Sequence, residues 1–471
     1  MEVIIKNEEL RGGGRRAKVG EMAGVDFTEF QKRLDALNAE QRQAVELPAG
    51  HALVLAGPGS GKTETLALRI AYLLSQKVYA GSILCLTFTD AAAANMRARL
   101  TGLVGAQAYR VPIHTFHSFC TELINRNPEY FYAGATFKPA DDLARIGIVQ
   151  DIFRSLAHDN PLRTEHPEQG FVYLKNAQSA IRDLKKAGMA PEDFKRFLAD
   201  NKKQFTAINA GIGVFDERLS AKRISVVREY AELIKPLANA LYASLSRALD
   251  VAEEDGKTVS LSEWKEKWTR KNDTGVRVFK DSLYAEKMDA LAEVYAEYGR
   301  AMRAKALFDF DDMILDVLAA FKKHDGFRQT IAERYAYVLV DEFQDTNEAQ
   351  MRILETFHGD ILVVGDDDQA IYKFQGAEVA NILGFKKRFP EARVIAFSAN
   401  YRSHNAIVEA ARGVASQGGN RLEVLGEYMK KGSVAVRGAG GEIVSKSFPT
   451  PVHEYAWIAG ELARLIEAGA N

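Results

Sequence analysis

A short apolar segment followed by a glycine-rich turn constrains the fold of this chain more than any other feature. Ala52–Ala56 predicts a buried strand, and Gly57-Pro58-Gly59-Ser60-Gly61 leads into a helical pattern that begins at about Lys62. With Ala56 at the first position, the segment to Thr63 fits the pattern G-x-x-x-x-G-K-[ST]. Glycines let the backbone N–H groups turn inward toward phosphate oxygens, and a helix N-terminus favours anions. The sequence therefore predicts a phosphate-binding loop.

Two carboxylates at the end of another apolar strand complete the expected metal site. The strand Tyr337-Val338-Leu339-Val340 ends in Asp341 and Glu342. In a parallel sheet, ligands gather at the carboxyl ends of the strands, so both acids should face the loop. Lys62 is expected to reach the β- and γ-phosphates, while Thr63 and Asp341 hold Mg²⁺. Glu342 is placed to deprotonate the attacking water. The alternative is that the two acids at the end of the strand only cap the loop that follows it.

Apolar strands alternate with helical segments on both sides of a long helical stretch. The strands are predicted at 52–56, 83–87, 337–341, 360–365 and 393–397, with helices at about 27–45, 62–74 and 91–100. This alternation favours an α/β fold with a parallel sheet covered on both faces. Residues 121–305 have helical spacing, many charges and no strong strand, which predicts a large helical insertion.

Composition excludes several classes of protein. Lys and Arg number 62 against 63 Asp and Glu, so the net charge of −1 supports no globally basic surface, and any basic groove must be local. The two cysteines, Cys85 and Cys120, form no disulfide framework or zinc pattern. No apolar stretch approaches the roughly 20 residues of a membrane span, and no signal peptide is evident. We expect a cytoplasmic protein without a membrane partner.

At this point the chain resembles superfamily I DNA helicases of the UvrD/Rep type. The resemblance rests on eight blocks in the family's order, of which the last but one is the most specific. The blocks are Leu37–Arg42, Ala56–Thr63, Leu86–Met96, Thr115–Ser118, Asp309–Asp312, Asp341–Thr346, Val364–Tyr372 and Asn400–Ser403. The resemblance implies a P-loop, RecA-like ATPase domain with ATP and Mg²⁺ as cofactors.

The resemblance also implies roles in nucleotide binding and catalysis. Gln41 would hydrogen-bond the adenine, and Tyr401 would stack on it. Gln369 would contact the γ-phosphate or the attacking water, and Arg402 would act as an arginine finger beside the catalytic Lys62 and Glu342. The residues expected to bind the phosphates are Gly57, Gly59, Ser60, Gly61, Lys62 and Thr63. For Arg402 the alternative is a surface ion pair.

Six residues are candidates for contacts with single-stranded DNA. Aromatic side chains stack on bases without regard to sequence, and hydroxyl or imidazole groups suit contacts with phosphate or sugar. The stacking candidates are Phe88, Tyr372 and Phe374, and the backbone-contact candidates are Thr89, Thr115 and His117. Core packing is the alternative for Tyr372 and Phe374.

Three positions depart from the family pattern. Asp90 stands where Asn is common, Gln375 where Arg is usual, and Glu64 where many members have Arg near the base. The first two changes weaken the expected binding of DNA, and they leave the expected ATP chemistry intact.

We expect five regions along the chain. They are a flexible leader (1–24), the first part of the RecA-like domain (25–120), the helical insertion (121–305), the second part (306–412) and the truncated start of a second RecA-like domain (413–471). An incomplete pair of RecA-like halves predicts a fragment that binds ATP but hydrolyses it weakly and does not unwind DNA alone.

Three functions fit these expectations. The first is a 3′-to-5′ helicase or translocase acting on single-stranded or 3′-tailed duplex DNA, with repair or recombination proteins as partners. The second is the helicase part of a RecB/AddA-type helicase-nuclease. The third is a nucleotide-gated DNA-binding protein that never unwinds. The 3′-to-5′ polarity comes from the resemblance alone.

Overall fold

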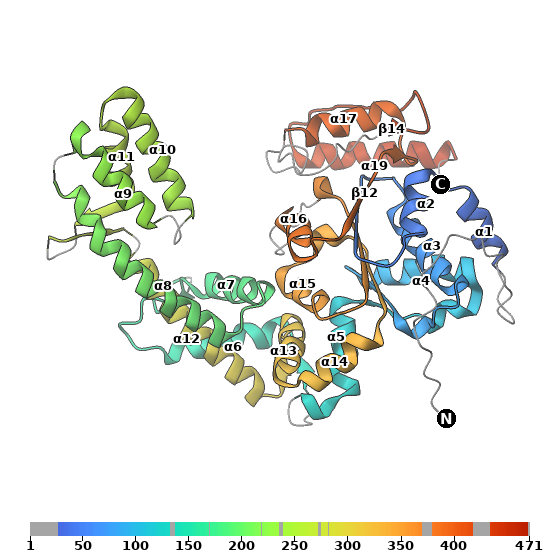
Figure 1. The fold of residues 1–471 in the computed structure, drawn as a ribbon, viewed down its shortest axis with the longest axis horizontal. Helices are drawn as coiled ribbons and strands as arrows, with labels where there is room; N and C mark the ends of the chain where they lie inside the picture. Colours follow the sequence, from blue (N-terminus) through green and yellow to red (C-terminus); the bar gives the residue numbers. More distant parts are fainter. Residues whose placement is uncertain are drawn as a thin grey trace.

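A parallel sheet with helices on both faces forms the part of the molecule at the right of Figure 1. The computed structural model describes residues 27–131, 137–168, 170–217, 219–234, 239–271, 275–280, 282–369, 379–417 and 434–469. The predicted leader, residues 1–24, lies outside the described residues.

Six strands make up this sheet, in the order β12-β1-β11-β10-β2-β3, and every neighbouring pair is parallel. Their bounds are β1 (Ala52–Ala56), β2 (Ile83–Thr87), β3 (Ile113–Thr115), β10 (Tyr337–Val340), β11 (Asp360–Gly365) and β12 (Arg393–Phe397). The prediction of a parallel α/β sheet is confirmed. The three-residue strand β3 is an addition that the sequence pattern did not reveal, because it is too short to show a period.

Alternate side chains of the central strands enter two separate hydrophobic cores. In β1, Val54 packs into the core on one face, whereas Leu53 and Leu55 pack into the core on the other. All five residues of β1 are buried, as expected for a strand covered on both sides. The continuous apolar runs that predicted these strands therefore reflect two-sided burial.

Two groups of helices cover the sheet, one on each face (Figure 1). The first group comprises α1 (Thr28–Asp35), α2 (Ala39–Val45), α3 (Lys62–Ser75) and α4 (Asp90–Val104). The second group comprises α5 (Phe116–Arg126), α13 (Phe310–Lys323), α14 (Asp325–Arg334), α15 (Glu348–Leu354) and α16 (Val379–Arg388).

The segment predicted as one helical stretch over residues 27–45 is two helices. Asn38 caps α2: its side chain accepts from the backbone N–H of Gln41, and the Gln41 side chain accepts from the Asn38 N–H. This reciprocal capping box fixes an extended backbone at Asn38 and ends the helical path between α1 and α2.

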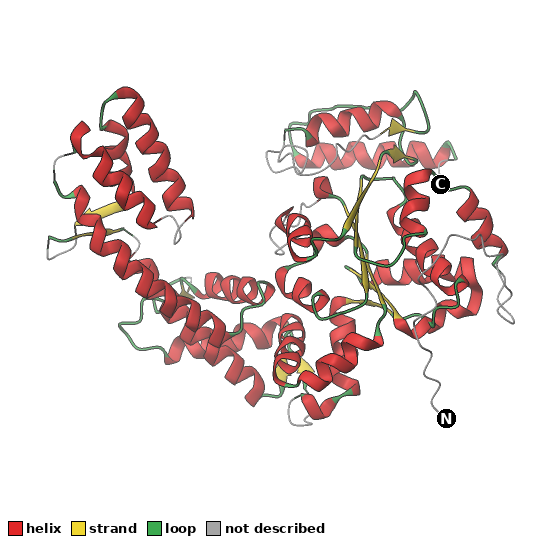
Figure 2. Ribbon diagram, in the orientation of Figure 1, coloured by secondary structure: helices red, strands yellow, loops and turns green. Residues whose placement is uncertain are grey.

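The helical insertion extends away from the sheet and contains two cores of its own (Figure 1). Its helices are α6 (Asp142–Ser155), α7 (Leu174–Lys186), α8 (Pro191–Gly211), α9 (Ile224–Ile234), α10 (Asn239–Asp255), α11 (Val259–Trp268) and α12 (Ser282–Ala304). Figure 2 shows that this part consists almost entirely of helices. Its described strands are β4 (Lys138–Pro139), β5 (Glu165–His166), β6 (Gly170–Phe171), β7 (Thr269–Lys271), β8 (Arg277–Phe279) and β9 (Leu307–Phe308). Since β4 pairs with β9, the chain enters and leaves the insertion at one place.

The last described segments are α17 (Asn405–Ala415), the pair β13 (Ala399–Asn400) and β14 (Val434–Ala435), and α19 (Pro451–Glu467). Across the described ranges, no helix combines the length and the hydropathy that crossing a membrane requires.

A buried lysine joins the insertion to the sheet domain. Lys185, near the end of α7, is 2% exposed, and its Nζ lies 2.6 Å from Asp309 Oδ2 and 2.5 Å from Asp312 Oδ1. Tyr298 of α12 donates to the same Asp309 oxygen. Arg352 of α15 donates to the carbonyl of Gly188, just beyond α7, at 2.6 Å. Side chains from three helices therefore hold the last turn of α7.

We predict that Lys185→Ala loosens this joint. Removing the ammonium leaves two carboxylates facing each other in a buried place, which typically costs about 3–5 kcal/mol. Urea unfolding should shift to lower concentration, and amide exchange in α7 should accelerate. Lys175→Ala, at an exposed position of the same helix, is the control and should change stability by no more than about 0.5 kcal/mol. Equal stability of the two variants would contradict the proposed joint.

Candidate functional site

The glycine-rich turn between β1 and α3 has a backbone that only glycine adopts readily. Gly59 and Gly61 have φ angles of 70° and 85°. A Cβ atom on Gly59 would lie 2.6 Å from Arg402 Cβ, and one on Gly61 would lie 2.9 Å from Gln41 Nε2. Both the conformation and the close approach of neighbouring segments therefore require glycine at these positions.

The ammonium of Lys62 lies inside this loop. Lys62 is 8% exposed, and its Nζ donates to the carbonyls of Ala56 at 3.1 Å and Gly57 at 3.4 Å. Asp366 Oδ2, after β11, is 3.8 Å away. The sheet order explains this neighbour, because β11 pairs with β1 and carries Asp366 to the same edge. Lys62 is thus a buried cation at the first turn of α3.

Thr63 and Asp341 meet across the sheet edge. Thr63 Oγ1 donates to Asp341 Oδ2 at 3.0 Å. Two adjacent ligands of an octahedral Mg²⁺, each at about 2.1 Å from the metal, lie about 3 Å apart. Because hydroxyl and carboxylate oxygens are suitable ligands for Mg²⁺, the two side chains fit a shared ion in both chemistry and spacing.

Three acidic side chains lie close together after β10. Burial and the like charge of Glu342 raise the pKa of Asp341 to about 6, and the same two causes raise the pKa of Asp345 to about 6. Asp345 Oδ1 is buried and has no hydrogen-bond partner in the part of the chain that the structure describes. The cluster therefore concentrates negative charge where a cation would be stabilised.

Glu342 adopts a left-handed backbone, with φ 51° and ψ 44°. Such a conformation is uncommon for a residue with a Cβ and is concentrated at functional sites. Its carboxylate accepts from Gln344 Nε2 at 2.6 Å. The unusual backbone and this hydrogen bond together direct the side chain beside Asp341.

Gln344 connects the acidic strand to its neighbour. Besides donating to Glu342, its Oε1 accepts from the backbone N–H of Asp366 at 2.9 Å. A Cβ on Gly365 would lie 3.0 Å from that same oxygen, so glycine leaves room for the contact. Gln369, on the turn Asp367–Gln369, donates to Asp366 Oδ2. One network therefore links the ends of β10 and β11.

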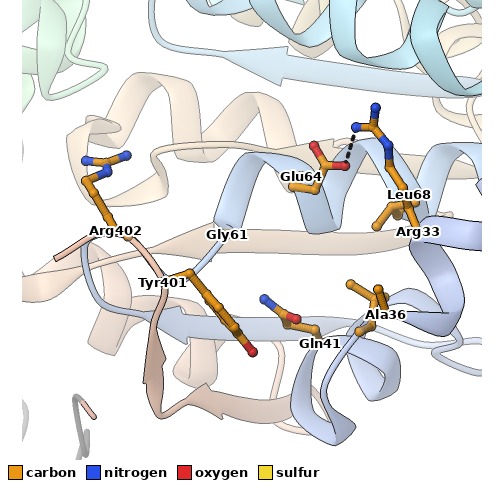
Figure 3. Close-up of a pocket in the computed structure, with 10 residues that line it drawn as sticks. Arg33, Ala36, Gln41, Gly61, Glu64, Leu68, Tyr401 and Arg402 are labelled. Atoms are coloured by element: carbon orange, nitrogen blue, oxygen red, sulfur yellow. Dashed lines mark hydrogen bonds and ion pairs between the residues drawn. The ribbon is translucent and has the colours of Figure 1, made fainter. Parts of the chain in front are cut away.

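A cavity of about 420 Å³ opens beside the phosphate loop (Figure 3). Gln41 stands at its floor, with Nε2 donating to the carbonyl of Ser60 at 2.8 Å. Tyr401 forms one side, where its hydroxyl accepts from Asn38 Nδ2 at 2.9 Å. The predicted base-binding residues Gln41 and Tyr401 therefore line one cavity.

The segment that carries Tyr401 and Arg402 is attached directly to the loop. Asn400 Nδ2 donates to the carbonyl of Pro58 at 2.8 Å, and the Tyr401 N–H donates to the carbonyl of Gly59 at 2.8 Å. Asn400 Oδ1 in turn accepts from the N–H of Arg402. Figure 3 shows the Arg402 side chain directed away from the Tyr401 ring.

Four of the candidate DNA-contacting residues lie at or just beyond the carboxyl ends of β2 and β3, at the same edge of the sheet. Thr89 and Thr115 cap helices, accepting from the N–H groups of Ala92 and Ser118. His117 packs edge-on against Phe310, and burial lowers its pKa. Phe88 is half-buried after β2. Tyr372, Phe374 and Gln375 lie outside the described residues.

Two residues of the site were missed by the sequence interpretation. Gln344 was considered only as a member of the segment Asp341–Thr346, although it donates to Glu342. Arg33 of α1 was not predicted at all, although it lines the cavity. Arg33 lies before the phosphate loop in a plain amphipathic helix, so no local pattern marks it.

A family model described as the UvrD/REP helicase N-terminal domain matches residues 37–390. The ATP-dependent DNA helicase UvrD1 of Mycobacterium tuberculosis (strain ATCC 25618 / H37Rv) is 31% identical over 403 residues, which are 83% of this chain and 40% of that protein. The ATP-dependent DNA helicase PcrA of Staphylococcus aureus (strain NCTC 8325 / PS 47) is 29% identical over 392 residues, covering 82% and 41%. The chain spans about two fifths of the length of these relatives.

We predict that Asp341→Asn stabilises the metal-free protein above about pH 6. The folded-state pKa of about 6 exceeds the ordinary 3.8, so the folded state binds the proton more tightly than the unfolded state. The ionised carboxylate therefore destabilises the fold fully above the folded pKa, and the effect disappears below the ordinary value. A shift of this size corresponds to roughly 1–3 kcal/mol.

Urea unfolding in EDTA at about pH 7.5 and pH 4.5 measures this difference. The gain from Asp341→Asn should be larger at the higher pH. Asp35→Asn, which removes an exposed carboxylate, is the control and should leave the pH dependence unchanged. A gain that grows as the pH falls would contradict the assignment.

Proposed function

This chain belongs to the UvrD/REP helicase family, and from that premise we propose that it binds ATP with Mg²⁺ and hydrolyses it to drive 3′-to-5′ movement on single-stranded DNA. The observation that carries the proposal is the 3.0 Å contact between Thr63 Oγ1 and Asp341 Oδ2 beside the buried Lys62. A bound Mg²⁺ would supply charge stabilisation for the transferring phosphoryl group. We also propose that the chain is divided into the five regions predicted from the sequence.

The phosphate loop has a pre-formed place for a triphosphate. Helix α3 begins at Lys62, so the unpaired N–H groups of its first turn favour an anion. Lys62 Nζ contacts two loop carbonyls and lies near Asp366, and it would exchange these neutral contacts for the β- and γ-phosphates. Asp366 remains close enough to keep the ammonium oriented.

Hydrolysis requires a base beside the γ-phosphate, and Glu342 suits this role. It directly follows the proposed metal ligand Asp341, and Gln344 fixes one of its oxygens. Gln369 is tied to Asp366 in the same network, which connects the ends of β10 and β11. A change at the γ-phosphate can therefore reach the segment after Gln369, where we place the stacking residues Tyr372 and Phe374.

The base would bind in the cavity beside Gln41. Its amide uses one donor hydrogen for Ser60 and one acceptor site for Asn38, which leaves one donor and one acceptor for a ligand. A free donor and acceptor side by side match the edge of an adenine. Tyr401 supplies an aromatic face on the same cavity.

The proposed DNA path follows the carboxyl edge of β2 and β3. We assign Phe88 to base stacking, and Thr89, Thr115 and His117 to the sugar-phosphate backbone. The two threonines already cap helices. They would therefore offer phosphates the N–H groups of the helix N-termini as well as their own hydroxyl groups. Arg402, exposed and attached to the phosphate loop, is proposed to stabilise the transition state.

We predict that Lys62→Ala and Glu342→Gln separate nucleotide binding from turnover. Loss of the ammonium should weaken ATP binding about tenfold to hundredfold, the range for a hydrogen bond to a charged group. Glu342→Gln should bind ATP normally while its turnover falls about 10²- to 10⁴-fold. Fluorescent-nucleotide titration and phosphate release, each with and without single-stranded DNA, measure the two effects.

Stimulation of wild-type turnover by single-stranded DNA would support a motor coupled to DNA. Equal ATP affinity in wild type and Lys62→Ala would contradict the proposed phosphate site. Nucleotide-dependent DNA binding without turnover would favour the gating function instead.

Gln344→Met gives a separate prediction. The substitution keeps the length of the side chain but removes both hydrogen bonds, so Glu342 loses its orientation. Turnover should fall about tenfold to hundredfold, as for other residues that orient a reacting group, with little change in the KM for ATP. Gln329→Met on the exposed side of α14 is the control. An unchanged kcat would show that Gln344 only connects the strands.

A further inference from the structure

Another cavity lies where the helical insertion joins the sheet domain, and it shares no residue with the cavity beside the phosphate loop. Its volume of about 370 Å³ is within the usual range of about 300–1,000 Å³ for ligand pockets. One wall comes from the turn between α7 and α8 and the first turns of α8, and the other comes from α13 and α15. Figure 1 shows α7 beside α13 and α15 at this joint. A ligand in this cavity would therefore contact both parts of the chain.

Hydrogen bonds fix the insertion's side of the cavity. Gly188, in the turn after α7, has a φ angle of 70°, and its carbonyl accepts from Arg352 Nη1 at 2.6 Å. A Cβ atom on Gly188 would lie 2.8 Å from that nitrogen, so glycine is needed for the arginine to approach so closely. The carbonyl of Met189 accepts from the Tyr295 hydroxyl at 2.9 Å. This wall is therefore formed before any ligand binds.

The α13 side of the cavity carries apolar side chains on the outer face of the helix. Leu315, Leu318, Ala319 and Lys322 follow the spacing i, i+3, i+4, i+7, so they share one face. The buried positions of α13 lie on the opposite face, which packs into the core of the sheet domain. Leu315 and Leu318 are only half-buried. Two leucines on an outer face, where polar residues are usual, indicate a place for an apolar group of a ligand.

Cations outnumber carboxylates around the cavity. Its lining contains four cations and two carboxylates, a local net charge of +2, whereas the whole chain has −1. One carboxylate, Asp193, pairs with Arg196 at 3.5 Å. Lys322, Lys323 and Arg352 have no ion pair within the ranges that the structure describes. Three cations beside an apolar surface are therefore available to an anionic ligand.

Helix stability alone explains only part of this arrangement. Lys322 and Lys323 lie in the last turn of α13, where cations interact favourably with the helix dipole. That account does not explain Arg352, which belongs to α15, or the two leucines on the same cavity. Apolar side chains surrounded by cations suit a ligand that is both apolar and anionic.

We propose that this cavity is a docking site for an acidic peptide segment of a partner protein. One apolar side chain of the peptide packs on Leu315 and Leu318. The peptide's carboxylates pair with Lys322, Lys323 and Arg352, and the arginine can bind a carboxylate through two parallel hydrogen bonds. A nucleic acid suits the cavity less well, because its continuous phosphates would also meet the two carboxylates of the lining. The site is separate from the phosphate loop and does not depend on the proposed function.

Fluorescence anisotropy of labelled peptides on the full chain tests the inference. The first peptide has one phenylalanine among aspartates, the second has alanine in place of the phenylalanine, and the third has lysines in place of the aspartates. The wild type should bind the first about fivefold or more tightly than the second, the usual effect of an interface anchor. It should bind the third not at all, and salt should weaken the binding of the first. Excess unlabelled oligothymidylate should not displace the first peptide.

Variants at the cavity test its cations and its apolar surface separately. Lys322→Glu combined with Lys323→Glu should lower the affinity for the first peptide about tenfold or more, because two attractions become repulsions. Leu315→Ser should lower it about fivefold and leave the affinity for the alanine peptide unchanged. Arg303→Glu combined with Lys305→Glu, an exposed pair around the end of α12, is the matched control and should bind like the wild type.

Glu192→Gln should produce a gain of affinity, which misfolding cannot imitate. Glu192 is exposed at the start of α8 and lines the cavity, so its carboxylate repels an acidic peptide. Removing that charge should raise the affinity for the first peptide about twofold to fivefold. Thermal unfolding followed by circular dichroism shows whether each variant remains folded.

Several outcomes would overturn the inference. They are equal affinity for the phenylalanine and alanine peptides, an equal loss in the lysine pair and its matched control, and displacement of the peptide by oligothymidylate. Failure of the folded wild type to bind the first peptide would overturn it as well. Nucleotide binding at the phosphate loop would be unaffected by any of these outcomes, so the proposed function is tested independently.

Discussion

The contact between Thr63 and Asp341 depends on how the sheet is ordered. The two residues follow strands β1 and β10, which are far apart in the chain and separated in the sheet by β11. Parallel pairing brings all three carboxyl ends to one edge, and this places Lys62, Asp366 and Asp341 around one volume. Two-sided burial of the strands keeps that edge rigid, and so the apolar core stabilises the polar site.

Around this site, two outer segments donate hydrogen bonds to backbone carbonyls of the loop. The side chain of Gln41 donates to Ser60 and that of Asn400 to Pro58, while the backbone N–H of Tyr401 donates to Gly59. Movement of the loop on binding a nucleotide would therefore reach both α2 and the segment before α17. On the other side of the sheet domain, Lys185 and Arg352 hold the last turn of α7, which connects the insertion to the helix that follows the acidic strand.

The sequence predicted the parts of this arrangement that have a local pattern. The strands, the phosphate loop and the acidic pair are continuous segments, and five of the six central strands were found because each is a buried apolar run. Strand β3 and the roles of Arg33 and Gln344 depend on contacts between distant residues. Arg33 pairs with Glu64, 31 positions away, and Gln344 bonds Asp366, 22 positions away. No local period encodes such contacts, since they exist only after the sheet has formed.

The central claim is that the phosphate loop and Asp341 form one site for a metal ion and a nucleotide. Electron paramagnetic resonance of Mn²⁺, used in place of Mg²⁺ with a non-hydrolysable ATP analogue, tests it most directly in wild type and Thr63→Val. The account predicts tight, nucleotide-dependent Mn²⁺ binding in the wild type and clearly weaker binding in the variant, because valine removes one oxygen ligand without changing the shape of the side chain. Equal Mn²⁺ affinity in the two proteins would contradict it.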